Sequence, residues 1–417
     1  MSAPRQEQNL ATEYTAQAAS SLVKGEVKIK IGESAFTVAG LFDVAEIPYV
    51  RLNALEIANY TVTAKTEEGD YSFSRMGNWT QPFFDALCDT YNKAVLRAFF
   101  VSGSPSLTAS GDYRLSESGA VSEGKAPLRV YENCIVALPP NGNARRIPLC
   151  FVNGMEKKDF ELTLKLNTGE SYTFSKLGYY SAQFAGATEN HIRALHEKSV
   201  AAVKEIDPSL TISQASQIAK LVPEGAAAPI GKLAAVSPSF TAAVEEKISR
   251  TRAAESYMSF KELCDPAQIW VGFKKNEIRS KGKGPNGESR ETDVPADGEE
   301  PDQYLFWMIV PSPDGRYMAV EFAVQPGESA ATFVYRTCSD FSRSAALLNR
   351  ALEAISFKRE VIRLTDEELL NPENADYYMA ARRTASLQYI RANFVGRVIH
   401  SSPESWKRKL TELWNLQ

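Results

Sequence analysis

Histidine, the side chain that most often carries acid–base chemistry, is scarce here, with three histidines among 417 residues. His191 and His196 are five residues apart on a segment with helical periodicity. On a helix of 3.6 residues per turn this spacing separates them by about 140° around the axis, which does not favour a shared metal ion. His191 falls near the apolar stripe that includes Phe184 and Leu195. We interpret it as a core histidine with its hydrogen bonds satisfied, not as a ligand.

The third histidine, His400, is followed by Ser401, Ser402 and Glu404, residue types that occur together in Ser–His–Glu catalytic sets. In the known triads the nucleophile, the base and the orienting acid come from distant segments of the chain. Adjacent residues on one turn rarely place the three groups in line. The sequence therefore predicts a capped turn between two helices at this point, and no catalytic histidine.

The cysteines number five and form no CxxC pair. In a long chain, this usage is typical of reduced and mostly buried thiols. The sequence also lacks the GxGxxG, GxxxxGK[ST], HExxH and GxSxG motifs of nucleotide-binding, metalloprotease and hydrolase sites. We predict no metal site, no cofactor and no catalytic cysteine. The cysteines are Cys88, Cys134, Cys150, Cys264 and Cys338.

Two adjacent arginines, Arg145 and Arg146, are the sharpest candidates for binding an anionic partner. They fall at the expected rim of a sheet, and an earlier, similar stretch of chain has Ala45 and Glu46 at the corresponding positions. Binding sites are expected on residues that differ in this way between similar stretches. A second basic run, at residues 274–290, is followed at once by acidic residues, and we interpret it as a self-compensating solvated loop.

The overall composition is that of an ordinary globular protein, with 44% hydrophobic and 24% charged residues. A formal charge of -4 and a pI near 5.7 give no bulk attraction to nucleic acid, which is not expected as a partner. A protein partner is expected, and peripheral contact with an anionic membrane remains open. No stretch approaches the roughly 20 apolar residues of a membrane span, and the N-terminus lacks the apolar core of a signal peptide. We expect a cytoplasmic protein without a transmembrane segment.

An internal repeat determines how these residues are positioned. The stretch GDYSFSRMG at residues 69–77 returns as GESYTFSKLG at residues 169–178. The register extends beyond the motif, since Ile47 and Asn53 match Ile147 and Asn153 at a spacing of one hundred residues. After one inserted residue the spacing becomes one hundred and one, as expected where a turn absorbs a length change. Searching for such repeats comes first, because they decide the architecture.

Each copy of the repeat reads as several antiparallel strands followed by one amphipathic helix. Alternating apolar residues predict the strands, and apolar residues at three- and four-residue steps after Gly77 predict the first closing helix. We predict an N-terminal helical segment (1–22), module 1 (23–104), module 2 (105–206), a helical linker (207–263), a third α/β module (264–358) with a disordered loop (276–302), and C-terminal helices (359–417). A polar connection rich in serine and glycine, at residues 102–124, should separate the modules.

This order of elements resembles the pleckstrin-homology-like (PH-like) superfold, including its GRAM-type relatives. The resemblance covers residues 27–206, and residues 269–357 are a candidate third copy. Many members of the superfold carry a tryptophan inside the closing helix, whereas here Trp79 falls at the start of the first helix and Tyr180 in the second. The resemblance implies an α+β fold of tandem modules that bind lipid headgroups, peptides or proteins and have no catalytic activity of their own.

We therefore expect a non-enzymatic interaction or scaffold protein that binds a protein or anionic partner, with Arg145 and Arg146 as candidate binding residues. The alternative is an enzyme with an unrecognised active site between the modules. A polar pocket that contains carboxylates with perturbed pKa values would favour the enzyme.

Overall fold

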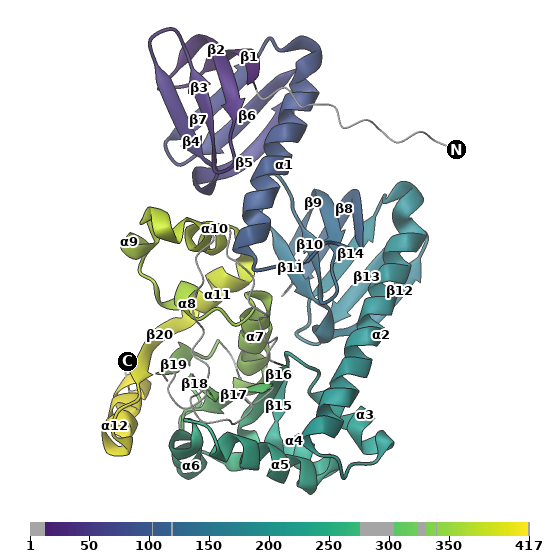
Figure 1. Cartoon of the computed structure of the whole chain (residues 1–417), viewed down its shortest axis with the longest axis vertical. Helices are drawn as coiled ribbons and strands as arrows, with labels where there is room; N and C mark the ends of the chain where they lie inside the picture. Colours follow the sequence, from purple (N-terminus) through teal and green to yellow (C-terminus); the bar gives the residue numbers. More distant parts are fainter. Residues whose placement is uncertain are drawn as a thin grey trace, which may run out of the picture.

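The computed structural model describes residues 13–101, 103–117, 120–275, 304–323, 331–338 and 340–415. Within these residues the chain forms two antiparallel sheet modules and a larger third unit (Figure 1). We call residues 13–101 module 1, residues 103–206 module 2, and residues 207–415 the third unit.

Module 1 is a seven-stranded antiparallel sheet followed by α1 (Thr80–Ala98). Its first and last strands pair at the centre of the sheet, where Ala18 lies opposite Phe73. The N-terminal helix that we expected is wrong for the described residues, because Glu13–Ala19 is a strand with alternating burial. The strand order is β4-β3-β2-β1-β7-β6-β5. The strands are β1 (Glu13–Ala19), β2 (Lys24–Ile31), β3 (Ala35–Ala39), β4 (Val44–Pro48), β5 (Leu52–Ala58), β6 (Thr61–Thr66) and β7 (Gly69–Ser74).

Module 2 repeats this topology, with the strand order β11-β10-β9-β8-β14-β13-β12 and the closing helix α2 (Ser181–Ile206). The expected polar connection is also wrong, because its serine- and glycine-rich residues form most of the long β8–β9 hairpin. The predicted fold class is confirmed as α+β, with tandem PH-like sheet modules each closed by a C-terminal helix. The strands are β8 (Leu107–Glu117), β9 (Ala120–Val130), β10 (Cys134–Ala137), β11 (Arg145–Pro148), β12 (Val152–Lys158), β13 (Glu161–Leu166) and β14 (Ser171–Ser175).

The repeated motif forms the joint between each sheet and its helix. Phe73 and Phe174 are fully buried, and each ring packs edge-on against the first phenylalanine of its closing helix. Gly77 and Gly178 have φ values of 55° and 57°, a left-handed conformation that glycine adopts without strain. The motif therefore recurs in both copies because it supplies the core and the turn.

The third unit is built on a six-stranded antiparallel sheet in the order β15-β16-β17-β18-β19-β20. Its two edge strands come from segments that we expected to be helical, at residues 207–263 and 359–417. The strands are β15 (Ala227–Pro229), β16 (Trp270–Lys275), β17 (Tyr304–Pro311), β18 (Tyr317–Ala323), β19 (Ala331–Arg336) and β20 (Phe394–Ile399). The helices are α3 (Ile212–Leu221), α4 (Ile230–Val236), α5 (Pro238–Ser249), α6 (Ala254–Leu263), α7 (Phe341–Ala354), α8 (Glu360–Arg363), α9 (Asp366–Leu369), α10 (Ala375–Arg383), α11 (Ala385–Asn393) and α12 (Pro403–Trp414).

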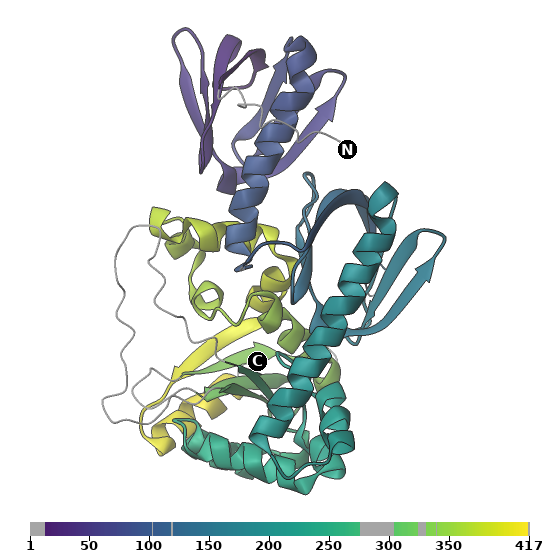
Figure 2. The same cartoon turned by 45° about the vertical axis from the view of Figure 1, so that its right-hand side comes forward.

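Helices cover both faces of the third sheet. The helices α3 to α6 and α12 pack with Met308 and Val310 on one face, whereas α7, α8, α10 and α11 pack with Ile309 and Val320 on the other. Figures 1 and 2 show these helices on opposite sides of the sheet. Double coverage explains why β17 and β18 are almost continuously buried, without the alternation of a half-buried strand.

One arginine of the third unit contacts both modules. Arg383, at the end of α10, donates from Nη1 to the carbonyl oxygen of Asn53 at 2.9 Å and from Nη2 to that of Pro139 at 3.3 Å. The modules also contact each other directly, because the Leu55 amide donates to the Pro140 carbonyl at 2.9 Å. These bonds fix the two modules relative to each other and to the third unit.

The disordered loop that we expected at residues 276–302 lies outside the described residues. Among the helices that the structure describes, none combines the length and the apolar character needed to cross a membrane.

Candidate binding sites

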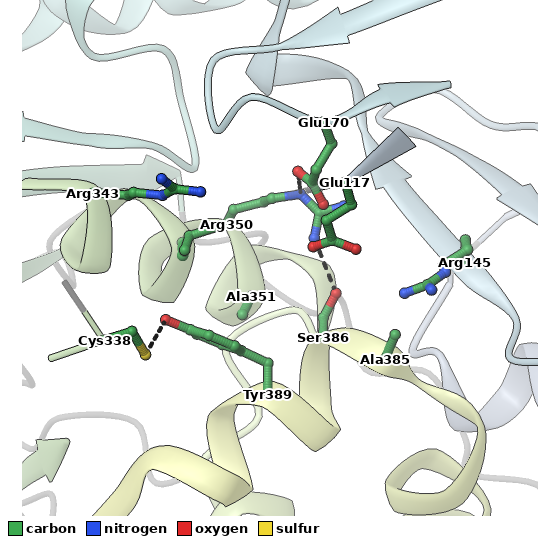
Figure 3. A pocket seen from close by; sticks show the side chains of 11 residues that line it. Glu117, Arg145, Glu170, Cys338, Arg343, Arg350, Ala351, Ala385, Ser386 and Tyr389 are labelled. Carbon is green, nitrogen blue, oxygen red and sulfur yellow. Dashed lines mark hydrogen bonds and ion pairs between the residues drawn. The ribbon is translucent and has the colours of Figure 1, made fainter. Parts of the chain in front are cut away.

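A cavity of about 530 Å³, lined by both charged and apolar side chains, lies between module 2 and the third unit (Figure 3). Module 2 contributes β8, β11 and the turn before β14, while the third unit contributes α7, α11 and the residue Cys338. Its volume is within the range of small-molecule sites. The lining residues are Glu117, Arg145, Glu170, Cys338, Arg343, Leu347, Arg350, Ala351, Ala385, Ser386 and Tyr389.

Arg350, on α7, is the most constrained side chain of this cavity and is 7% exposed. Its Nε lies 2.8 Å from Oε2 of Glu170, and its Nη2 donates to the Tyr172 hydroxyl at 3.0 Å. Its Nη1 donates to the Ser386 hydroxyl at 3.3 Å (Figure 3). Because these partners belong to module 2 and to α11, the guanidinium is held in place from both sides of the cavity.

Glu170 is the buried carboxylate of the cavity. Burial raises the pKa of Glu170, while the positive charge of Arg350 and a hydrogen bond from Thr168 oppose that shift. The Thr168 hydroxyl donates to Oε2 at 2.5 Å, the same oxygen that faces Arg350. The carboxylate is therefore engaged by groups of the protein itself.

The structure separates the two arginines that the sequence grouped together. Arg145 is half-buried and lines the cavity, and among the described residues its guanidinium forms no hydrogen bond or ion pair (Figure 3). Arg146 does not lie at a rim, which corrects our expectation. It is 3% exposed. Its Nη1 donates to Oε2 of Glu353 at 2.9 Å and to the backbone carbonyl oxygen of Glu353 at 2.6 Å. Successive side chains of a strand point to opposite faces, so only Arg145 is available to a ligand.

Cys338 and Tyr389 close another side of the cavity. The Cys338 sulfur lies 3.7 Å from the Tyr389 hydroxyl and 3.4 Å from Oδ1 of Asn393. Burial raises the pKa of Tyr389, and the neighbouring thiol raises it further. The phenol therefore stays protonated at neutral pH and remains a potential hydrogen-bond donor to a ligand.

The histidines lie outside this cavity and apart from one another. His191 is half-buried rather than in the core, with Nε2 2.8 Å from the Ser106 hydroxyl. His196 faces Ser216 at 3.5 Å. His400 does not engage the serines beside it in sequence. Its Nε2 lies 2.9 Å from Oε1 of Glu321 on β18. In the described part of the chain, no three histidine, cysteine, aspartate or glutamate residues cluster as metal ligands would.

A second candidate surface is formed by exposed aromatic residues that recur in both modules. Tyr60, in the β5–β6 turn, is 81% exposed, and Phe160, at the same position of the β12–β13 turn, is 87% exposed. Both turns have two residues with positive φ, 48° and 58° in module 1 and 48° and 65° in module 2. Such turns favour Asn-Gly or Asp-Gly, and here Asn59 and Asp159 occupy the first position. An aromatic residue replaces the glycine in both copies.

Further exposed aromatic residues lie at the same end of each module. Strand pairing places the start of β6 beside the end of β7, and likewise the start of β13 beside the end of β14. The β5–β6 turn is therefore at the same end of module 1 as Trp79, which is 58% exposed. The β12–β13 turn is at the same end of module 2 as Tyr179 and Tyr180, which are 85% and 45% exposed. We call these two surfaces the aromatic ends. The helices α1 and α2 run in similar directions, so both ends point away from the third unit (Figures 1 and 2).

No family model matches the chain, and no curated protein is similar enough to count as a match. The two candidate sites are therefore assigned from their geometry and chemistry.

Proposed function

We propose that this chain is a cytoplasmic, non-enzymatic scaffold that binds a protein partner through the aromatic ends of its tandem PH-like modules. The observation that carries the proposal is the repeated turn with Tyr60 and Phe160. A bulky residue at positive φ costs about 1–2 kcal/mol, and a ring that is more than 80% exposed recovers little of this cost by packing. An exposed aromatic residue at positive φ occurs in the same turn of both modules, and contact with a partner explains this repeated, unfavourable residue best.

The fixed placement of the modules supports a two-point contact. Arg383 joins module 1, module 2 and the third unit, and Leu55 joins the two modules directly. A partner that engages both ends therefore loses little additional orientational freedom in the second contact, which increases its overall affinity.

The charges beside the second turn do not form the basic cluster that attracts an anionic membrane. Asp159 and Glu161 flank Phe160, Lys157 and Lys158 precede them, and all four charged side chains are exposed. The two carboxylates balance the two lysines, so the turn has no excess of positive charge for lipid headgroups. A protein surface can match such mixed charges around an apolar pocket for the ring.

The alternative function, an enzyme with its active site between module 2 and the third unit, has one observation in its favour. Burial raises the pKa of Glu170, which lines the cavity, and such shifts are common in active sites. However, Arg350 and Thr168 both engage the same Glu170 oxygen, and no histidine lies in the cavity. These contacts are typical of a structural ion pair and favour binding over acid–base catalysis.

The test is affinity purification of the tagged full-length chain from its host cells, with recovered proteins quantified by mass spectrometry. The variant Tyr60→Gly/Phe160→Gly keeps the backbone of both turns and removes both rings. Its matched control is Phe42→Gly, since Phe42 is 90% exposed in module 1 and the second copy has Gly142 at that position. We expect a partner that the double variant loses and the control retains.

Two results would contradict the proposal. Identical recovery with the wild type and the double variant would exclude the aromatic ends as the partner site. Sedimentation with anionic phospholipid vesicles that depends on Tyr60 and Phe160 would assign these turns to a membrane surface instead. Folding of each variant is checked by circular dichroism, so that loss of recovery cannot come from unfolding.

A further inference from the structure

We propose that the cavity between module 2 and the third unit is a binding site for a small organic anion, whose carboxylate or phosphate group contacts Arg145 and Arg350. This site is separate from the aromatic ends and does not depend on the proposed function. Its volume of about 530 Å³ suits a ligand of metabolite size.

The unmatched arginine of the cavity favours an anion. Three arginines and two glutamates line the cavity, and Glu170 is already matched by Arg350. Arg145 forms no ion pair within the described residues, so no carboxylate is in direct contact with its charge. An anionic group that contacts Arg145 and Arg350 would provide charge-assisted hydrogen bonds to both guanidinium groups.

Arg350 has hydrogen-bonding capacity that the described residues do not use. Its Nη1 and Nη2 each donate one hydrogen bond, to Ser386 and Tyr172, and each carries a second N–H, whereas its Nε is buried beside Glu170. A guanidinium has five N–H donors in a planar fork, which matches the oxygens of a carboxylate or phosphate. Because Tyr172 and Ser386 already hold the side chain, a ligand would not have to order it on binding.

Arg145 provides the second cation. It extends from β11 toward the cavity and forms no hydrogen bond or ion pair within the described residues (Figure 3). Arg350 reaches the same space from α7, on the opposite wall. Two guanidinium groups from different units can therefore approach one anionic group from two directions.

The remaining walls indicate what the rest of the ligand looks like. Leu347, Ala351 and Ala385 offer apolar surface, and Ser386 and Tyr389 offer hydroxyl groups. A short aliphatic body with polar substituents fits this lining. The shared chemistry is thus a small acid, which can be either a carboxylate or a phosphate ester.

The experiment is isothermal titration of the full-length protein with sodium phosphate, sodium succinate and, as a control for ionic strength, sodium chloride. We expect saturable binding of phosphate or succinate and none of chloride. Binding of phosphate alone identifies the ligand as a phosphate ester, and binding of succinate alone identifies it as a carboxylic acid. Absence of saturable binding by both anions at about 10 mM, which corresponds to only about 2.7 kcal/mol of binding free energy, would overturn the proposal.

Three variants locate the site. Arg145→Gln removes the charge and should weaken binding by about tenfold or more, as expected when a charge-assisted hydrogen bond is lost. Leu347→Trp keeps every charge and fills the cavity, so it should also abolish binding. The matched control is Arg114→Gln, on an exposed position of β8, which should bind as the wild type does. Equal affinity for the wild type and Arg145→Gln would also overturn the proposal.

The outcome is independent of the scaffold function. The variant Tyr60→Gly/Phe160→Gly should titrate with the anion as the wild type does. Loss of the partner in that variant together with normal anion binding would support both proposals separately, and failure of either measurement leaves the other intact.

Discussion

Arg146 and Glu353 form a buried ion pair that joins module 2 to the third unit. Arg146 belongs to the edge strand β11 and Glu353 to the last turn of α7, and the two residues are each 3% exposed. The guanidinium contacts both carboxylate oxygens, at 2.9 and 3.3 Å. A carboxylate that is buried without its partner is strongly unfavourable, so this pair couples the packing of the two units.

We predict that Arg146→Ala lowers the free energy of unfolding by about 3–5 kcal/mol, because it leaves the Glu353 carboxylate buried and unpaired. Urea denaturation measures the change. The neighbouring variant Arg145→Gln, in which no protein hydrogen bond is lost, should stay within about 0.5 kcal/mol of the wild type. The double variant Arg146→Met/Glu353→Leu should recover most of the stability. Similar effects of Arg146→Ala and Arg145→Gln would contradict the assignment of the buried and the available arginine.

A second prediction concerns the repeated motif. Phe73→Ala should destabilise the protein by about 3–5 kcal/mol, because Phe73 is fully buried and packs edge-on against Phe36 and Phe83. Thermal and urea denaturation measure the change, with Phe42→Ala as the exposed control of the same residue type. A loss below about 1 kcal/mol would mean that the core of module 1 collapses around the missing ring.

The sequence predicts the repeated part of the fold because the same pattern of strands and closing helix occurs twice, so each copy supports the interpretation of the other. It misses β1, whose apolar side is made of Tyr14, Ala16 and Ala18. Alanine has a high helix propensity, so a strand whose alternating buried residues are alanines is easily mistaken for a helix in the sequence. The strand forms because β2 and β7 provide partners on both sides, a tertiary effect that local sequence does not contain.

The cavity escapes sequence analysis for a different reason. Glu117, Arg145, Arg350 and Tyr389 are far apart in the chain, and only the packing of α7 and α11 against module 2 brings them together. One local signal was present in the arginine pair. Adjacent residues on a strand point to opposite faces, so Arg145 and Arg146 are expected to have different surroundings, one of them buried.

A third prediction concerns pH. Glu205, near the end of α2, accepts a hydrogen bond from the Tyr304 hydroxyl and is 3.2 Å from Nζ of Lys275, and these contacts lower the pKa of its carboxyl group. Since the folded-state pKa lies below 4.5, the contacts stabilise the fold above that pH and lose their effect as the pH falls through the folded-state value.

The difference in stability between the wild type and Glu205→Gln should therefore be largest at neutral pH and shrink in acid. Urea denaturation of both proteins across this pH range measures the difference. The control is Glu255→Gln, an exposed position on the third unit's helix α6. A difference that grows as the pH falls would contradict a lowered pKa for Glu205.

The last prediction tests whether the β5–β6 turn is strained. Tyr60→Gly removes the clash of a side chain at positive φ, which costs about 1–2 kcal/mol, and introduces a glycine, which costs about 0.5–1 kcal/mol in unfolded-chain entropy. The net expectation is a gain of about 0.5–1 kcal/mol in the free energy of unfolding. Tyr60→Ala separates the two possible causes, because it removes the ring but keeps Cβ and therefore the strain, and it should bring no gain. A stability loss above about 1 kcal/mol in Tyr60→Gly, measured by urea denaturation, would show that the ring packs against module 1 and would remove the basis for assigning it to a partner.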